Sequence, residues 1–166
     1  MKQIFVRLDH CTGCHTCELA CAVEHSVSKE LFAAISEPTL PKKRLFVEYF
    51  PSRAVPILCR QCEDAPCLNS CISGALWRDE RGAVRRKKEK CIGCWTCIMV
   101  CPYGVISRQL LAGRWITAKC DLCDARQSPA CVDACPTRAL VWAEPDEFSK
   151  QRRKDSRSAL VMGARE

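Results

Sequence analysis

The chain has 166 residues, of which sixteen are cysteine, a share typical of proteins held together by disulfides or metal. Apolar residue types make up 48% of the sequence, but without cysteine their share falls to about 39%, little for a conventional hydrophobic core. The formal net charge is +7. Outside a run near the C-terminus we see no basic patch, so composition argues against a nucleic-acid-binding protein.

The sequence also bounds the compartment. No stretch approaches the ~20 apolar residues of a membrane-spanning helix. Residues 1–6 contain neither a long apolar core nor a twin arginine, so we expect a cytoplasmic protein. In a reducing cytosol, metal binding is favoured over disulfide formation as the use of sixteen cysteines.

In the first third of the chain, residues 3–8 are predicted to form a short strand, and residues 17–25 a short helix. A first cysteine group begins after this strand and continues into the helix. Its spacing is C-x2-C-x2-C-x3-C: Cys11, Cys14, Cys17 and Cys21. Residues 26–44 are mixed and contain two prolines, so we interpret them as a connector, followed by a strand at 44–50.

The middle of the chain holds two further groups. One has spacing C-x2-C-x4-C-x3-C: Cys59, Cys62, Cys67 and Cys71. The other has spacing C-x2-C-x2-C-x3-C-P: Cys91, Cys94, Cys97 and Cys101, followed by Pro102. Between them, residues 74–78 and 82–86 predict a β-hairpin. The segments CTGCHTC and CIGCWTC are repeats, so we expect the loops at 11 and 91 to share one structure.

In the last third, residues 104–109 and 113–118 predict a second hairpin that turns near Ala112 and Gly113. A fourth group follows with spacing C-x2-C-x7-C-x3-C-P: Cys120, Cys123, Cys131 and Cys135, followed by Pro136. Residues 138–143 should form a closing strand. Residues 150–157 are strongly basic and could form a helix, a docking segment or a disordered tail.

The run at Cys91 is the spacing that bacterial ferredoxins use for cubane iron–sulfur clusters, in which the fourth cysteine ligates the other cluster of a pair. Four groups of four supply the sixteen ligands of four [4Fe-4S] clusters and leave no thiol over. An oxidised cluster with its four thiolates carries a charge of about −2, so four clusters offset the basic surplus. Since clusters would replace part of the core, the apo chain should fold poorly.

Two other kinds of metal site share part of these motifs. Zinc also binds C-x2-C pairs, but a tetrahedral zinc site needs two such pairs and has no use for a third cysteine at the same spacing. Residues 11–15 match the C-x-x-C-H motif of covalent haem attachment. However, Cys17 and Cys21 complete the ferredoxin run at once, and Trp95 takes the place of His15 in the repeat. We therefore favour iron–sulfur clusters over zinc, haem or disulfides.

A resemblance to a known family rests on four segments: CTGCHTCELACAVEHS, CRQCEDAPCLNSC, KCIGCWTCIMVCPYG and KCDLCDARQSPACVDACPTRAL. They resemble the four-cluster ferredoxin-like electron-transfer subunits of anaerobic oxidoreductases. Those subunits serve carbon monoxide dehydrogenases, hydrogenases, formate dehydrogenases, molybdopterin reductases of the dimethyl-sulfoxide-reductase type and tungsten aldehyde oxidoreductases. The resemblance covers residues 3–144.

The resemblance implies that the first three cysteines of one group share a cluster with the last cysteine of its mate. The implied ligand sets are Cys11, Cys14, Cys17 and Cys135; Cys21, Cys120, Cys123 and Cys131; Cys59, Cys62, Cys67 and Cys101; and Cys71, Cys91, Cys94 and Cys97. The implied fold is α+β, with two ferredoxin-like two-cluster units, one inserted in the other. Residues 1–25 with 106–144 would form the outer unit, 26–50 the connector, 51–105 the inner unit and 145–166 a basic tail.

Such ligand sets leave no iron site open, and no catalytic triad, phosphate loop or paired-carboxylate site is visible. We therefore expect an electron-transfer subunit and not an enzyme. It would relay single electrons between a larger catalytic subunit and a second partner: a flavoprotein, a ferredoxin or another copy of itself. For the catalytic subunit we favour the tungsten or molybdenum aldehyde oxidoreductase or carbon monoxide dehydrogenase type.

The alternatives are a free-standing polyferredoxin or a hydrogenase or formate dehydrogenase subunit. An enzyme with a labile cluster iron and a redox sensor that binds nucleic acid are less favoured. Partner contacts are expected from residues 26–44 and 145–166. Lys90 and Lys119 each precede a cysteine group directly, and either lysine could stabilise a reduced cluster or simply be solvated.

Overall fold

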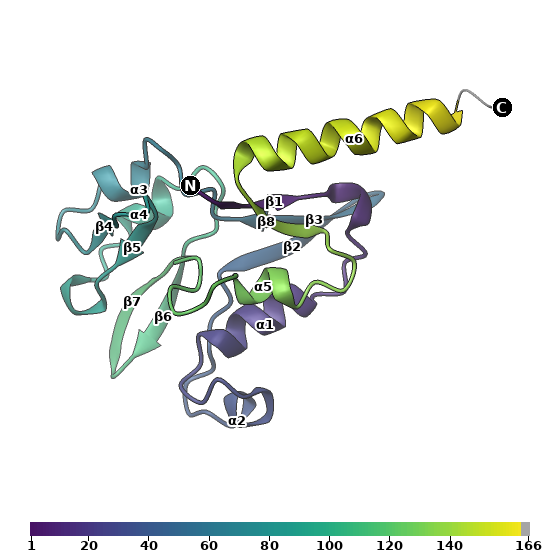
Figure 1. Cartoon of the computed structure of the whole chain (residues 1–166). Coiled ribbons are helices and arrows are strands. Elements are labelled where there is room, and N and C mark those ends of the chain that lie inside the picture. Colours follow the sequence, from purple (N-terminus) through teal and green to yellow (C-terminus); the bar gives the residue numbers. More distant parts are fainter. Residues whose placement is uncertain (164–166) are drawn as a thin grey trace.

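The computed structural model describes residues 1–163, which form four two-stranded antiparallel sheets joined by short helices (Figure 1). This is the α+β architecture that the sequence predicted. Strand β1 (Gln3–Val6) pairs with β8 (Leu140–Ala143), as the two predicted terminal strands allow. Buried Ile4 and Leu140 lie on this sheet, so pairing of the two distant strands closes the outer part of the chain.

A second hairpin joins β2 (Leu45–Phe50) to β3 (Arg53–Leu58). The sequence predicted β2 but not β3, whose Pro56 lacks the backbone N–H of a ladder donor and is tolerated because each sheet has only two strands. Leu45 and Leu58 are buried in the same apolar cluster as Ile4. The boundary predicted between residues 50 and 51 thus falls inside a hairpin that packs against β1 and β8.

Both predicted hairpins of the later chain are confirmed. Strand β4 (Leu76–Arg78) pairs with β5 (Val84–Arg86), and β6 (Ser107–Leu111) pairs with β7 (Arg114–Ala118). Ala112 and Gly113 connect the second pair with φ values of 47° and 76°. Two consecutive positive φ angles are the geometry of a type I′ turn, which suits the twist of a tight hairpin.

Most helices are single turns. Helix α1 (Thr16–Glu24) lies one residue from the predicted helix, and α2 (Leu31–Ile35) lies in the segment expected to be a connector. The remaining short helices are α3 (Pro66–Asn69), α4 (Thr96–Met99) and α5 (Ala130–Asp133), with 3-10 turns η1 (Leu8–His10) and η2 (Lys88–Lys90). Four-residue helices carry too few residues for periodicity to reveal them in a sequence.

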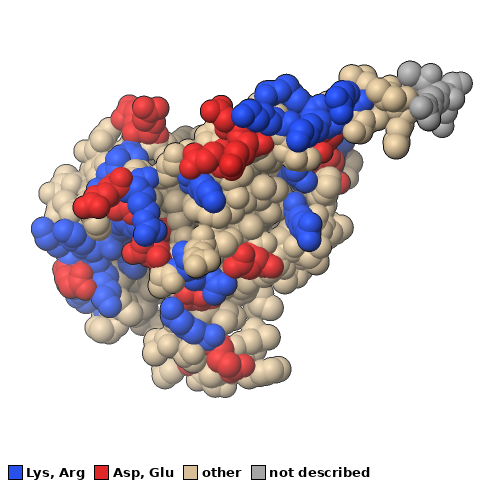
Figure 2. All heavy atoms as spheres, viewed as in Figure 1, with Lys and Arg blue, Asp and Glu red and all other residues tan. Residues whose placement is uncertain are grey.

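Helix α6 (Pro145–Gly163) is one continuous helix that contains the basic run at residues 150–157. Proline at its first position and the Glu147 carboxylate, which accepts from the Glu144 N–H at 3.3 Å, favour helix initiation here. Phe148 stacks on Phe5 with ring centroids 4.4 Å apart, which fixes the first turns over β1. Beyond that contact α6 projects past the body of the molecule, and Lys and Arg line it (Figures 1 and 2).

The apolar interior is divided into clusters that include cysteines. One contains Ile4, Leu45 and Leu140 with Cys17, Cys21 and Cys131. A second contains Leu76, Val84 and Ile106 with Cys67 and Cys97. Within residues 1–163, no helix has the length and apolar character needed to cross a bilayer.

Candidate metal centres

The two repeated loops have the same backbone geometry. Gly13 and Gly93 have φ of 71° and 72°, and the residues two positions later, His15 and Trp95, have φ of 57° and 66°. These left-handed angles curl each loop so that α1 or α4 begins directly after it, with Cys17 or Cys97 buried in its first turn. Gly93 is required by contact as well as by φ, since a Cβ there would lie 2.8 Å from the Trp115 carbonyl oxygen.

The structure brings the sixteen cysteines into four sets of four. Three sets each line a cavity of their own: Cys11, Cys14, Cys17 and Cys135 (the first centre); Cys21, Cys120, Cys123 and Cys131 (the second); and Cys59, Cys62, Cys67 and Cys101 (the third). The fourth centre comprises Cys71, Cys91, Cys94 and Cys97: burial raises the pKa of Cys97, and the other three thiols lie close enough to raise it further.

Neighbouring centres approach one another in a definite order. Burial raises the pKa of Cys131, and Cys17 of the first centre adds to this shift. Likewise the pKa of Cys120 is raised by burial and then by Cys59 of the third centre. Burial also raises the pKa of Cys67 in the third centre, with a contribution from Cys97 of the fourth.

Direct contacts give the same order. Cys17 and Cys131 share one apolar cluster, and Cys67 and Cys97 share another. Lys119 Nζ donates hydrogen bonds to both Cys59 Sγ and the Cys120 carbonyl, which joins the second and third centres. The four centres therefore follow one another from first to fourth, an arrangement we call the row.

The donor chemistry of these cavities fits iron–sulfur clusters. All sixteen cysteines are free thiols in the described structure. Burial raises the pKa of Cys17 to about 11 and that of Cys21 to about 12, so four such thiolates in one cavity need a cation to compensate them. A cubane with four thiolate ligands matches the donors, whereas a disulfide does not.

Hydrogen bonds reach the cysteine sulfurs from defined donors. The backbone N–H groups of Arg44 and Ala139 donate to Cys21 Sγ at 3.3 Å and to Cys135 Sγ at 3.2 Å. In the repeated loops, the Thr16 hydroxyl donates to Cys14 Sγ at 3.4 Å, as the equivalent Thr96 does at Cys94. Such bonds lower the pKa of Cys14, and around a cluster they tune reduction potential.

Lys119 occupies the junction of the second and third centres. Its side chain is buried, with 3% exposure, although an ammonium group is costly to desolvate. The Nζ donates to Val84 O at 2.9 Å, to Cys120 O at 3.0 Å and to Cys59 Sγ at 3.5 Å. Lys90, which the sequence could not distinguish from it, is exposed at the end of η2.

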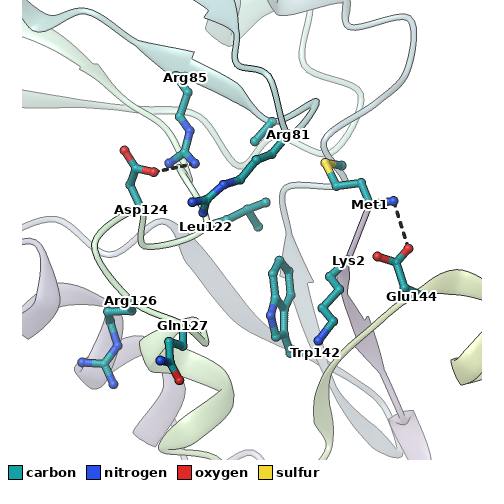
Figure 3. Close-up of a pocket in the computed structure, with 11 residues that line it drawn as sticks. Met1, Lys2, Arg81, Arg85, Leu122, Asp124, Arg126, Gln127, Trp142 and Glu144 are labelled. Carbon is teal, nitrogen blue, oxygen red and sulfur yellow. Dashed lines mark ion pairs between the residues drawn. The ribbon is translucent and has the colours of Figure 1, made fainter.

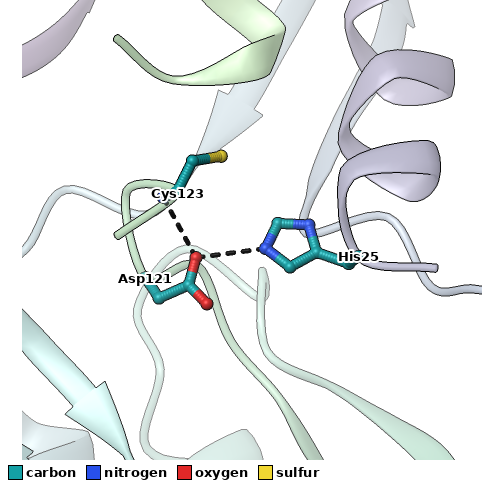
Figure 4. A group of neighbouring side chains, drawn as sticks. All are labelled: His25, Asp121 and Cys123. Carbon is teal, nitrogen blue, oxygen red and sulfur yellow. Dashed lines mark hydrogen bonds and ion pairs between the residues drawn. The ribbon is translucent and has the colours of Figure 1, made fainter. Parts of the chain in front are cut away.

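An ion pair that the sequence did not reveal supports the second centre. Asp121 Oδ1 accepts from His25 Nε2 at 3.1 Å and from the Cys123 backbone N–H at 3.1 Å (Figure 4). Its Oδ2 pairs with the buried Arg44 guanidinium. Burial favours the neutral acid, but His25 and Arg44 outweigh it and hold the pKa of Asp121 well below its usual range.

The same three side chains, His25, Asp121 and Cys123, lie close enough together to hold a metal ion. However, each has another role: Cys123 lines the second centre, and Asp121 is bound to His25 and to the Arg44 guanidinium. His15, the residue of the haem-like motif, is likewise held by Glu18 Oε2 at 3.0 Å. Through these contacts His15 and His25 support the cysteine loops.

One cavity has no cysteine in its lining. It measures about 420 Å³ and lies between the N-terminal residues, the β4–β5 turn and the loop 122–127 (Figure 3). Its charges are largely paired: Arg85 with Asp124 at 2.8 Å, and the Met1 amino group with Glu144 at 2.9 Å. Leu122, from the loop of the second centre, lies between these pairs. We find no donor set for a metal in this cavity.

Comparison with known proteins adds three findings. A family model described as a 4Fe-4S dicluster domain matches residues 48–144, and a 4Fe-4S binding domain model matches residues 8–24. "Electron transport protein HydN" of Escherichia coli (strain K12) is 39% identical, over 97% of this chain and 98% of that protein. "Thiosulfate reductase electron transfer subunit PhsB" of Salmonella typhi is 38% identical, over 86% of this chain and 75% of its own length.

A solved structure, the active site complex BamBC of benzoyl coenzyme A reductase with benzoyl-CoA, is also similar. The match covers 100% of this chain and 98% of that chain, with 22% identity and a TM-score of 0.45. A TM-score of this size does not by itself establish a common fold. The family of this chain is shown by the dicluster model and by the two sequence relatives.

Proposed function

The chain belongs to the ferredoxin-like electron-transfer proteins with 4Fe-4S dicluster domains, and we propose that it relays single electrons along four [4Fe-4S] clusters. The observation that carries this proposal is the arrangement of sixteen free cysteines as four sets of four in one row. Like its relatives, the chain is an electron-transfer protein and not a catalyst. When bound, the clusters supply one-electron chemistry.

We propose that each of the four sets is one ligand set, with the shared pattern that the family resemblance implies. Each centre would then take three cysteines from one group and one from its mate, which ties distant parts of the chain together. The division into an outer unit and an inserted inner unit follows from this pattern and is part of the proposal. It is supported by the antiparallel pairing of β1 with β8 around the inserted chain.

The residues of the chain have three tasks in this scheme. Apolar side chains around the centres exclude water, which lowers the local dielectric constant. Less solvent then has to rearrange when a centre gains or loses an electron. Backbone and hydroxyl donors to sulfur stabilise the reduced state at particular centres. Buried Lys119 places positive charge between the second and third centres, where an electron must cross from one half of the chain to the other.

We propose a larger catalytic oxidoreductase subunit as one partner, since one relative is named as the electron transfer subunit of a reductase. The tungsten or molybdenum aldehyde oxidoreductase or carbon monoxide dehydrogenase type remains our choice, in the cytoplasm, where thiols stay reduced. Exposed Phe32 and Ile35 on α2 and exposed Leu160 and Met162 on α6 support contacts by these two segments. Affinity capture from an anaerobic lysate tests the partner, and recovery of no oxidoreductase subunit would contradict it.

Single serine substitutions test the ligand sets. Cys14→Ser and Cys135→Ser should alter the same electron paramagnetic resonance (EPR) signal and midpoint potential, because both lie in the first centre. Cys131→Ser, only four residues from Cys135, should alter a different signal, that of the second centre. If Cys135→Ser and Cys131→Ser affected one and the same signal, the shared pattern would be wrong.

A further inference from the structure

The fourth centre reaches the surface through the exposed Cys94, as the first centre does through Cys14. The side chains around the two ends differ. Ile92 beside Cys94 and Trp115 of β7 are also exposed. The segments that hold these residues, η2 with its loop and the β6–β7 hairpin, also carry four exposed cationic side chains: Lys88, Lys90, Arg108 and Arg114. We call this group of seven residues the fourth-centre surface.

Contacts hold the fourth-centre surface together. Gly93, next to Cys94, lies against the Trp115 carbonyl so closely that a Cβ would approach it to 2.8 Å. The Arg108 guanidinium lies over the Trp115 ring, 4.7 Å from its centroid. Arg114, from the same strand as Trp115, donates to the Lys88 carbonyl at 3.4 Å. Arg108 and Arg114 are thereby tied to the strand that lies against Gly93, directly before Cys94, and Arg114 also joins this strand to η2.

This part of the chain is distinguished by its scarcity of acidic residues, a feature that the sequence analysis did not single out. Residues 86–118 contain six basic residues and a single acidic one, Glu89. Figure 2 shows Lys and Arg side chains gathered over the β4–β5 side of the molecule, which leads into η2. An apolar and cysteine centre with a cationic rim favours a partner of negative charge, because such a rim speeds and orients its approach.

The opposite end of the row has different chemistry. Cys11 of the first centre lines a broad hollow of about 880 Å³ together with Leu8, Tyr49 and Phe50. Its charges are mixed, with Asp9 and Arg53 both in the lining, and Asp9 pairs with Arg152 of α6 at 3.6 Å. A large hollow with apolar side chains and balanced charge suits a lasting contact, whereas a basic rim suits rapid electrostatic encounter.

We propose that the fourth-centre surface docks a small, acidic one-electron carrier protein, which exchanges electrons with the row at Cys94. This rests on the proposed function. In the exchange, one electron leaves the reduced carrier and enters the fourth centre, so the carrier is oxidised and the chain is reduced by one equivalent. No bond forms or breaks, and no proton is required. The reverse transfer uses the same contact.

Stopped-flow kinetics with a reduced, acidic plant-type [2Fe-2S] ferredoxin and the oxidised, cluster-loaded chain test this proposal. The double variant Lys88→Glu/Arg108→Glu reverses two charges of the fourth-centre surface without touching a cysteine. The matched control is Lys150→Glu/Arg153→Glu on exposed positions of α6, which changes the net charge by the same amount. At low salt we expect the second-order rate constant to fall at least tenfold in the first variant and less than twofold in the control.

Salt should remove the difference between the variants, because charges separated by more than ~3 Å are screened at 1 M ionic strength. Equal losses in the two double variants would show that net charge matters and not this surface, and unchanged rates in both would also overturn the docking proposal. A coulometric titration of the same samples distinguishes failure of the docking proposal from failure of the proposed function. If the wild-type chain takes up fewer than four electrons, the proposed function is wrong. If it takes up four and the second-order rate constant is the same in wild type and in Lys88→Glu/Arg108→Glu, only the docking proposal is wrong.

Discussion

Lys119→Met should lower the reduction potential of the two central centres. The side chain is 3% exposed, and its Nζ lies 3.5 Å from Cys59 Sγ and 3.0 Å from the carbonyl of Cys120. An electron added to either centre is attracted by this ammonium group. Methionine has a similar length and apolar stem, so the substitution removes the charge while leaving most of the packing.

The size of the effect follows from Coulomb's law. With an effective dielectric constant of about 20, and a distance of about 7 Å between the ammonium and an electron spread over a cube, the interaction is about 2 kcal/mol. For one electron this corresponds to roughly 100 mV, since about 59 mV is a tenfold change in the equilibrium constant. We therefore expect one or two of the four midpoint potentials to fall by about 50–100 mV.

EPR-monitored redox titration measures these potentials one centre at a time. Lys150→Met, at an exposed position of α6, is the control and should leave all four within about 20 mV of wild type, because an exposed charge is screened. Iron content must be measured on the same samples, since Val84 O loses its 2.9 Å donor. Unchanged potentials in a fully loaded Lys119→Met, or an equal shift of all four, would refute the reasoning.

Three further predictions concern stability and cluster retention. Gly93→Ala should lower stability by about 1–2 kcal/mol more than Gly104→Ala, since both have positive φ but only Gly93 has a backbone oxygen within 2.8 Å of its Cβ position. Urea unfolding followed by cluster absorbance measures this, and equal losses would contradict it. Asp121→Asn should lower the free energy of unfolding by about 2–3 kcal/mol in the same assay, because the buried Arg44 guanidinium loses its charged partner. The 32% exposure of Asp121 keeps the loss below that of a fully buried pair. Asp124→Asn, at a 69% exposed position, should cost under about 1 kcal/mol, and similar values for the two would count against the network. Deleting residues 158–166, a range that includes the exposed Leu160, Val161 and Met162 of α6, should leave iron content and the unfolding midpoint unchanged, whereas loss of iron would show that this segment is structural.

Cysteine spacing was the strongest signal in the sequence, because a cluster loop needs its thiols at fixed short intervals. The two later hairpins could also be predicted, since tight turns such as Ala112–Gly113 have a local chemical signature. The single-turn helices α3, α4 and α5 could not, because four residues show no helical period. Strand β3 was missed, and its proline is acceptable only in a sheet with a free edge.

The side chains that support the cysteine loops could not be predicted from the sequence, because their partners are distant along the chain. Arg44 and Asp121 are 77 residues apart, and nothing local in either segment indicates that they meet. Lys90 and Lys119 occupy the same position relative to a cysteine group, yet one is solvated and the other is buried between two centres. Such differences arise from how the two halves of the chain pack, which spacing alone does not encode.

The central claim, four complete [4Fe-4S] centres that only carry electrons, is tested most directly by coulometric reduction of the anaerobically purified chain combined with iron and sulfide analysis. The account predicts four electrons and about sixteen irons and sixteen sulfides per chain, one electron for each cubane. Two electrons and about eight irons per chain, or zinc in place of iron, would contradict it.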